Sequence, residues 1–149
     1  MRSPEVADGL QVETLVALTD ADAWMIERLL GQLSSSATYD RALIESMLGH
    51  DAIELLAARQ GERIVGMATL VSFPLPTGVR GFVEDVVTDA SVRGQGVGRL
   101  LLTTMIDIAV ARGFRSLELT SRPSREVALR LYESVGFVRR DTNVLRFTP

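Results

Sequence analysis

The chain has 149 residues and a net charge of −3, and its 16 basic residues are all arginine, with one histidine and no cysteine. Without cysteine there is no thiolate nucleophile, disulfide or Cys-ligated metal, and without lysine there is no Schiff base or phosphate-loop lysine. A multi-histidine metal site is impossible with His50 alone. The negative charge argues against a nucleic-acid or anionic-membrane partner. No apolar run approaches the roughly 20 residues of a membrane span, and the N-terminus lacks a signal-peptide pattern, so we expect a cytoplasmic protein.

No repeat, low-complexity tract or long linker divides the sequence, so we predict a single domain over 1–149, with 1–9 as a frayed leader. In the N-terminal half the predicted elements are strands over Leu10–Leu18, Ile53–Arg59 and Ile64–Phe73, a helix capped by Thr19 and ending before Ser34, and a short helix between Asp40 and Gly49. Pro74 and Pro76 have no amide proton, so we expect the third strand to end there.

In the C-terminal half the predicted elements are a strand over Gly81–Thr88, a glycine-rich turn over Arg93–Gly98, a long helix ending near Arg112, a strand over Leu117–Ser121, a helix over Arg125–Val135, and two short strands around Val138 and over Val144–Phe147. This order of strands and helices is typical of an α/β (α+β) domain with a mixed sheet.

The glycine-rich turn is the most informative segment of the chain. Gly94, Gly96 and Gly98 lie between a strand and a helix, where free backbone N–H groups and the helix dipole favour a phosphate. Arg93 and Arg99 add positive charge there. The spacing reads R-x-x-G-x-G, which fits neither the dinucleotide fingerprint nor the triphosphate loop. Taken alone, the turn could equally be a tight corner that binds nothing.

Two motifs together resemble the GNAT superfamily of acetyl-CoA-dependent N-acetyltransferases. Residues 83–99 resemble motif A of that family, and residues 128–137 are similar to its A-x-x-x-Y-x-x-x-G-F signature. The resemblance implies a mixed, mostly antiparallel sheet of six or seven strands, splayed between the strands at 81–88 and 117–121 and flanked by about four helices.

The same resemblance implies acetyl-CoA as the co-substrate, and no metal. The backbone of the central strand would pair with the pantetheine arm, and the turn would hold the pyrophosphate. Arg125 stands where many members have an asparagine that contacts the cofactor. The expected cofactor-binding residues are Val86, Val87, Thr88, Arg93, Gly94, Gln95, Gly96, Val97, Gly98, Arg99 and Arg125.

Acetyl transfer to an amine needs a base, a donor to the oxyanion and a proton for the departing thiolate, but no covalent enzyme intermediate. Glu84 and Asp85 are the candidate bases, because charged residues are disfavoured mid-strand unless they face a cleft. Strand alternation separates them unless a bulge intervenes, and we favour Glu84. The pair resembles the Glu-Asp of glucosamine phosphate N-acetyltransferases, and the family resemblance makes Tyr132 the thiolate's donor. Structural ion pairs, and a packed ring for Tyr132, are the alternatives.

The expected acceptor is a primary amine of a small metabolite. The resemblance implies that the first two helices cover its site, where Trp24 and Tyr39 would touch it, and Arg146 resembles an arginine that binds sugar phosphate. His50 is expected to be structural. A homodimer through the C-terminal strands is expected because sheet edges must be covered. A different acyl group, a protein N-terminal or side-chain acetyltransferase and a non-catalytic CoA-binding module stay open.

Overall fold

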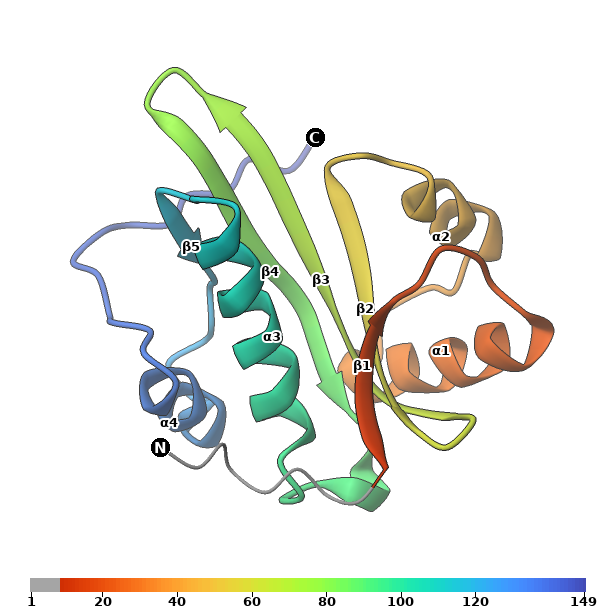
Figure 1. Cartoon of the computed structure of the whole chain (residues 1–149). Coiled ribbons are helices and arrows are strands. Elements are labelled where there is room, and N and C mark those ends of the chain that lie inside the picture. Colours follow the sequence, from red (N-terminus) through yellow and green to blue (C-terminus); the bar gives the residue numbers. More distant parts are fainter. Residues whose placement is uncertain (1–8) are drawn as a thin grey trace. The chain divides into compact units, whose positions relative to one another are not determined.

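The computed structural model describes residues 9–149, which divide into two compact units, one ending at Leu119 and the other spanning Thr120–Pro149 (Figure 1). The first unit contains β1 (Leu10–Thr14), α1 (Asp20–Leu33), α2 (Arg41–Leu48), β2 (Ile53–Gln60), β3 (Arg63–Leu75), β4 (Gly78–Thr88), a 3₁₀ turn (Ala90–Val92), α3 (Val97–Ala111) and β5 (Ser116–Glu118), and the second contains α4 (Glu126–Ser134). A single domain over 1–149 stays a prediction. Except for Gly9, the predicted leader lies outside the described residues.

The sheet has the order β1-β2-β3-β4-β5. The first four strands pair antiparallel, and β5 joins β4 in parallel. The predicted mixed, mostly antiparallel sheet with four helices is therefore confirmed for the described residues. The predicted number of strands is wrong, because the sheet there has five strands rather than six or seven.

The two missing strands are those predicted around Val138 and over Val144–Phe147. Residues 135–149 form no strand, and Val144, Leu145 and Phe147 are between 74% and 91% exposed. Strand propensity reflects a fit to a pleated, half-buried surface, and these residues have no paired strand beside them. The predicted homodimer interface involved these two strands, and the homodimer itself stays a prediction.

Pro74 does not end β3, contrary to the sequence prediction. The strand runs on to Leu75 and turns directly into β4, with Leu75 opposite Gly78. Ser72 N–H points toward the β2 side, where it donates to Ala52 O at 2.9 Å. Two residues later the nitrogen of Pro74 faces the same side, beyond the last β2 pair at Ile53 and Val71. A proline is tolerated there because the missing amide proton has no acceptor to meet.

β1 and β5 are shorter than predicted. β1 ends at Thr14 rather than Leu18, since the chain leaves the sheet after Leu15 N–H donates to Leu55 O at 2.9 Å. β5 covers Ser116–Glu118 rather than 117–121.

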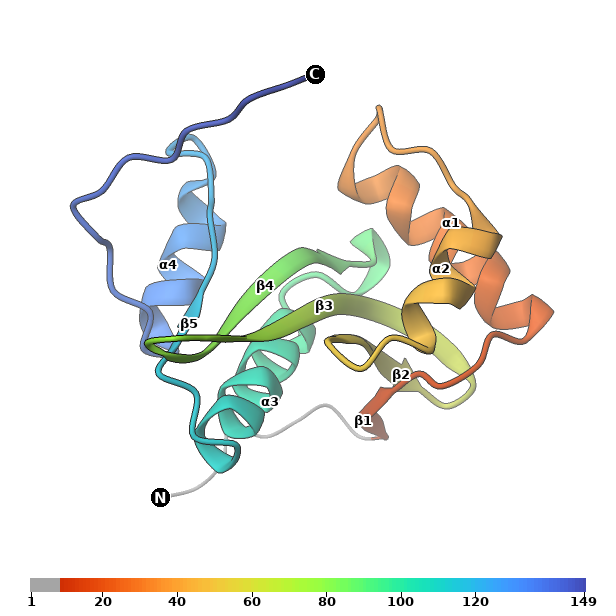
Figure 2. The same cartoon turned by 90° about the horizontal axis from the view of Figure 1, so that it is seen from above.

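Helices α1 and α2 cover one face of the sheet and α3 covers the other (Figure 2). Thr19 caps α1 as predicted, its Oγ1 accepting from Asp22 N–H at 3.1 Å, and Asp40 caps α2. The residues of the core beneath α1 and α2 come from both helices and from three central strands, and include Ile26, Leu29, Ile44, Leu55, Ala57, Met67 and Val87.

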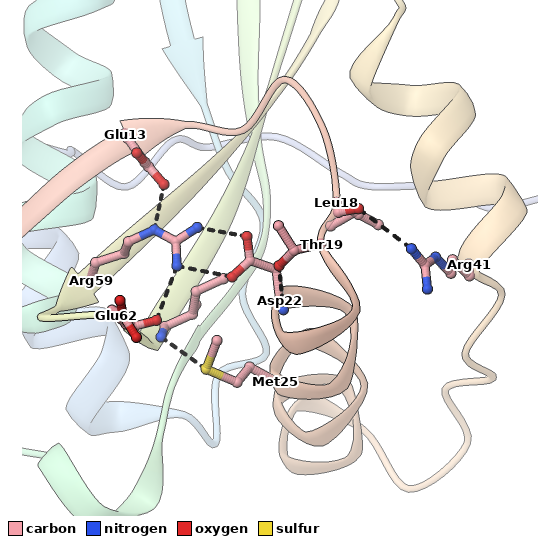
Figure 3. A network of polar contacts seen from close by, with 9 residues as sticks. Glu13, Leu18, Thr19, Asp22, Met25, Arg41, Arg59 and Glu62 are labelled. Carbon is pink, nitrogen blue, oxygen red and sulfur yellow. Dashed lines mark hydrogen bonds and ion pairs between the residues drawn. The ribbon is translucent and has the colours of Figure 1, made fainter.

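An ion-pair network fixes the start of α1 to the sheet (Figure 3). Arg59 of β2 donates to both carboxylate oxygens of Asp22, at 2.9 and 2.7 Å, and also pairs with Glu13 of β1. The hydrogen bond from Arg59 lowers the pKa of the buried Asp22 carboxyl. Further along α1, the sulfur of Met25 accepts from Ile64 N–H at 3.2 Å. These contacts hold α1 in one place over the sheet.

Gly66 of β3 lets α3 approach the sheet closely. A Cβ at this position would lie 2.6 Å from Val97 Cγ1, 3.2 Å from Val87 O and 3.3 Å from Leu101 Cδ1. Val97 is the first residue of α3. The absence of a side chain at Gly66 therefore lets the first turn of α3 pack directly against β3.

We expect Gly66→Ala to lower the free energy of unfolding by about 1–3 kcal/mol, because the added methyl group overpacks this contact. Urea denaturation measures the effect. Gly31→Ala is the matched control, since Gly31 lies within α1 and its added Cβ would have no neighbour within 4 Å among the described residues beyond the helix's own backbone. That variant should be as stable as the wild type or slightly more stable. A Gly66→Ala protein of wild-type stability would contradict the close contact.

Candidate active site

A β-bulge in β4 places the two candidate bases. Thr69 of β3 lies opposite Glu84 and Met67 lies opposite Val87, so that one residue of β3 faces two of β4. Asp85 takes up the bulge with a φ of 51°, in the left-handed region. Glu84 and Asp85 are both exposed residues, although the carboxyl group of Glu84 is partly shielded from solvent. The simple alternation expected of a regular strand is therefore broken between these two carboxylates.

Glu84 faces the side of the sheet that α1 and α2 cover. It lies opposite Thr69, which in turn lies opposite the core residue Leu55, and cross-strand partners share a face. Partial burial raises the pKa of the Glu84 carboxyl, and the negative charge of Asp85 raises it further. A carboxylate with a raised pKa is a better proton acceptor near neutral pH.

β4 has a free edge beyond its short contact with β5. The two strands pair only over Arg80–Phe82 and Ser116–Glu118. Among the described residues, the segment Val86–Thr88 has a strand partner on the β3 side alone. Its other edge can accept an extended ligand by strand-like hydrogen bonding.

The glycine-rich turn forms an open N-terminus for α3. Gly94 and Gly96 have φ values of 79° and 83°, and Gly96 is the N-cap, with no side-chain capping bond. A Cβ at Gly94 or Gly96 would have no neighbour within 4 Å among residues 9–149. The first N–H groups of a helix have no intrahelical partner, so those of Val97 and Gly98 are suited to a phosphate.

Asp89 anchors the entry to this turn. Its carboxylate is almost fully buried; it accepts from Ser91 N–H at 2.9 Å and lies 3.3 Å from Arg63 Nη2 and 3.7 Å from Arg28 Nη2. The hydrogen bond from Ser91 lowers the pKa of this carboxyl, with help from both arginines. Ala90 N–H also donates to Gln32 Oε1 of α1 at 2.8 Å. Sequence reasoning missed Asp89, although an Asp two residues before a serine is a turn signal.

The predicted site residues divide between the two units. The first unit brings together Glu84, Asp85 and the edge of β4, which leads directly into the Arg93–Arg99 turn. Tyr132, Arg125 and Arg146 belong to the second unit.

Within the second unit, Tyr132 is buried and its ring contacts that of Phe137 edge-on, with centroids 6.3 Å apart. Phe137 N–H also donates to Tyr132 O at 3.1 Å. Arg125 is the exposed N-cap residue of α4 and makes no side-chain capping bond, and Arg146 is exposed.

The weaker candidates lie on or near α1 and α2. Trp24 is 63% exposed on α1, and Tyr39 packs against the core beneath the helices. His50 Nδ1 accepts from Ala52 N–H at 3.1 Å, which gives it a local structural role after α2.

The described residues contain neither a membrane-spanning helix nor a cluster of metal-ligating side chains. Within residues 9–149, no helix is both long and apolar enough to cross a membrane. No three His, Asp or Glu side chains of those residues gather where a metal ion could be held.

Comparison with known proteins gives a family. The model of the acetyltransferase (GNAT) family matches residues 20–137. A mycothiol acetyltransferase of Brachybacterium faecium is 30% identical over 136 residues, covering 87% of this chain and 41% of that protein. An N-alpha-acetyltransferase of Mycobacterium tuberculosis is 32% identical over 127 residues, covering 85% and 78%. The crystal structure of a Trypanosoma brucei acetyltransferase matches with a TM-score of 0.77 at 28% identity, over 94% of this chain and 99% of that one.

The fold and the site together define an α/β protein in which a bulged central strand leads to a glycine-rich turn suited to binding a phosphate. Because the family model covers most of its length, the chain belongs to the acetyltransferase (GNAT) family, and the resemblance seen in its sequence is confirmed. The chain spans about half the length, or less, of several curated relatives that it matches.

Proposed function

We propose that the protein is an N-acetyltransferase that moves an acetyl group from acetyl-CoA to a primary amine by direct transfer in a ternary complex. The observation that carries the proposal is the continuity of β4: a bulge bearing Glu84, a free strand edge and an open helix N-terminus follow one another within residues 84–99. The family membership supports the same chemistry.

The described residues suit acetyl-CoA. The positive φ values and open surroundings of Gly94 and Gly96 leave the N–H groups of the turn accessible to a pyrophosphate, and Arg93 adds charge beside them. The free edge of Val86–Thr88 suits the amides of a pantetheine arm. When bound, acetyl-CoA supplies the thioester whose acetyl group is transferred.

Glu84 accepts a proton from the acceptor's ammonium group, directly or through a water, so that the neutral amine attacks the thioester carbonyl. A backbone N–H near Val87 donates to the oxygen on which negative charge develops. Tyr132 gives a hydrogen bond or a proton to the sulfur as the C–S bond breaks. The amine's second extra proton passes to solvent, Glu84 then releases its proton, and Tyr132 is reprotonated from solvent, so that the products are the amide, the free thiol and one proton.

A small metabolite is the proposed acceptor. The names of the relatives differ, since one is a mycothiol acetyltransferase and another is an N-alpha-acetyltransferase. The match to the N-alpha-acetyltransferase covers 85% of this chain, which favours a protein N-terminus as the second candidate.

Calorimetric titration with acetyl-CoA tests the proposed cofactor. We expect saturable binding with one site per chain, and competition by free CoA. An absence of binding at millimolar acetyl-CoA would remove the basis of the proposed function.

Replacing Tyr132 by phenylalanine should lower kcat by about 10- to 100-fold while the Kd for acetyl-CoA stays within about twofold, because only the donor to the leaving thiolate is lost. An assay of CoA release measures kcat, and calorimetry measures the Kd for acetyl-CoA. The ring contact with Phe137 does not need the hydroxyl group, so the fold should be preserved. Equal turnover in the two proteins would show that Tyr132 is only a packed ring.

A further inference from the structure

Arg80 of β4 has an unusual environment. Its Nε is buried and has no hydrogen-bond partner within the described part of the chain, and the same holds for Ser116 Oγ. The two residues are register partners in the parallel pairing of β4 and β5, so both side chains lie on the same side of the sheet. Buried polar atoms without partners are rare in folded proteins, because each loses its hydrogen bonds to water and gains none in return.

Arg80 also lacks a counter-charge. Within residues 9–149 no carboxylate lies within ion-pair distance of Arg80, whereas Arg41, Arg59 and Arg112 each pair with one or two. The side chain is only partly buried, so part of it remains open to a ligand. A sheltered guanidinium is stabilised when an anion pairs with it.

Arg80 shares its face of β4 with the candidate base. Arg80 lies opposite Phe73 and Glu84 lies opposite Thr69, and residues two apart on a strand point to the same side. Phe82 lies between them, and its ring stacks on that of Phe73 with centroids 5.6 Å apart. At about 3.3 Å per residue, the Cα atoms of Arg80 and Glu84 are roughly 13 Å apart.

We propose that Arg80 binds an anionic group, a carboxylate or a phosphate, carried by the acceptor at some distance from its primary amine. The amine lies at Glu84, the body of the acceptor packs on Phe82, and the anion receives charge-assisted hydrogen bonds from the part of the Arg80 guanidinium that is open to solvent. This inference rests on the proposed function and narrows its acceptor to an ω-amino acid or an amino-alcohol phosphate.

The test measures kcat/KM for CoA release with three series of amines of matched length: ω-amino carboxylates, amino-alcohol phosphates and neutral alkylamines. The wild-type protein should favour one anionic series over the neutral series by about 10- to 100-fold. The favoured series identifies the anion as carboxylate or phosphate.

Arg80→Gln should abolish this preference through a higher KM, while kcat/KM for the neutral amines and the Kd for acetyl-CoA stay within about twofold. Arg80→Glu should instead favour diamines of the same length. Arg112→Gln is the control, because it removes a surface guanidinium paired with Glu54 at the far end of α3 and should leave the preference unchanged.

Two results would overturn the inference and leave the proposed function intact. One is a wild-type protein that acetylates neutral and anionic amines equally well. The other is an Arg80→Gln variant that loses activity equally toward all three series, which would make Arg80 structural. If no amine of any series releases CoA although acetyl-CoA binds, the proposed function fails, and the inference fails with it.

Discussion

Replacing Glu84 by glutamine should lower kcat/KM for acetyl transfer by about 100-fold or more, because a positioned general base contributes 10²–10⁴ to such a reaction. Glutamine keeps the size and the position of the side chain on the face of β4 but cannot accept the proton. The acetyl-CoA affinity should not change, since Glu84 lies before the free edge and the turn.

The pH dependence should change with the rate. Burial and the charge of Asp85 raise the pKa of Glu84, so its carboxylate is lost as the pH falls through that raised value. Wild-type kcat/KM therefore falls on the acidic side with this ionisation, and the profile of Glu84→Gln should lack it. The measurement is the rate of CoA release between pH 5 and about 9.

Asp85→Asn is the matched control for this experiment. Asparagine tolerates the left-handed conformation of the bulge at φ 51°, so the backbone should keep its course. Activity should fall only a few-fold, and the acidic limb should move to lower pH because a neighbouring charge is gone. If Asp85→Asn removed the limb and Glu84→Gln left it in place, the base would be Asp85.

Gly96→Ala should raise the Kd for acetyl-CoA by about tenfold. Gly96 has a φ of 83°, and a non-glycine residue in this conformation costs about 1–2 kcal/mol. The turn relieves this strain by changing its conformation, which moves the N–H groups away from the phosphate and weakens binding. No neighbour in the described part of the chain lies within 4 Å of the added Cβ, so the effect is one of backbone conformation rather than of packing. Calorimetry measures the Kd, and urea denaturation measures the accompanying loss of stability.

Gly113→Ala separates binding from stability in this test. Gly113 has a φ of 69° and follows the C-terminus of the same helix, and none of the described residues lies within 4 Å of an added Cβ there either. Both variants should lose similar free energy of unfolding, but only Gly96→Ala should bind acetyl-CoA more weakly. An equal Kd in the two variants would place the pyrophosphate elsewhere.

Local signals in the sequence predicted most of the first unit. Thr19 and Asp40 cap their helices by accepting a hydrogen bond from the N–H group three residues later. This interaction depends only on residues close together in the chain, so it can be predicted from the sequence. The turn at Gly94 and Gly96 was predicted for the same reason, since only the glycine spacing is needed to see it.

Features that depend on pairing with distant segments were predicted poorly. Pro74 stays within β3 only because β2 has already ended beside it, and nothing near Pro74 in the sequence shows this. The residues at 144–147 have strand propensity but no paired strand, and propensity alone does not supply one.

In the candidate site, too, local features were predicted from the sequence and features that depend on distant segments were not. Glu84, Asp85 and the turn were found from the sequence, but their separation by a bulge depends on the register with β3. Asp89 and Arg80 were missed because their importance lies in the partners they have or lack: Arg28 and Arg63 around Asp89, and no carboxylate near Arg80 within the described residues.

Acceptor-dependent release of CoA from acetyl-CoA tests the central claim most directly. The chain has no cysteine, so every thiol that appears in the assay comes from CoA. We predict that amines of one chemical class accelerate thiol release in proportion to enzyme concentration, with one acetyl amide formed per thiol. Binding of acetyl-CoA without thiol release for any amine or N-terminal peptide would contradict this account and would favour a CoA-binding module.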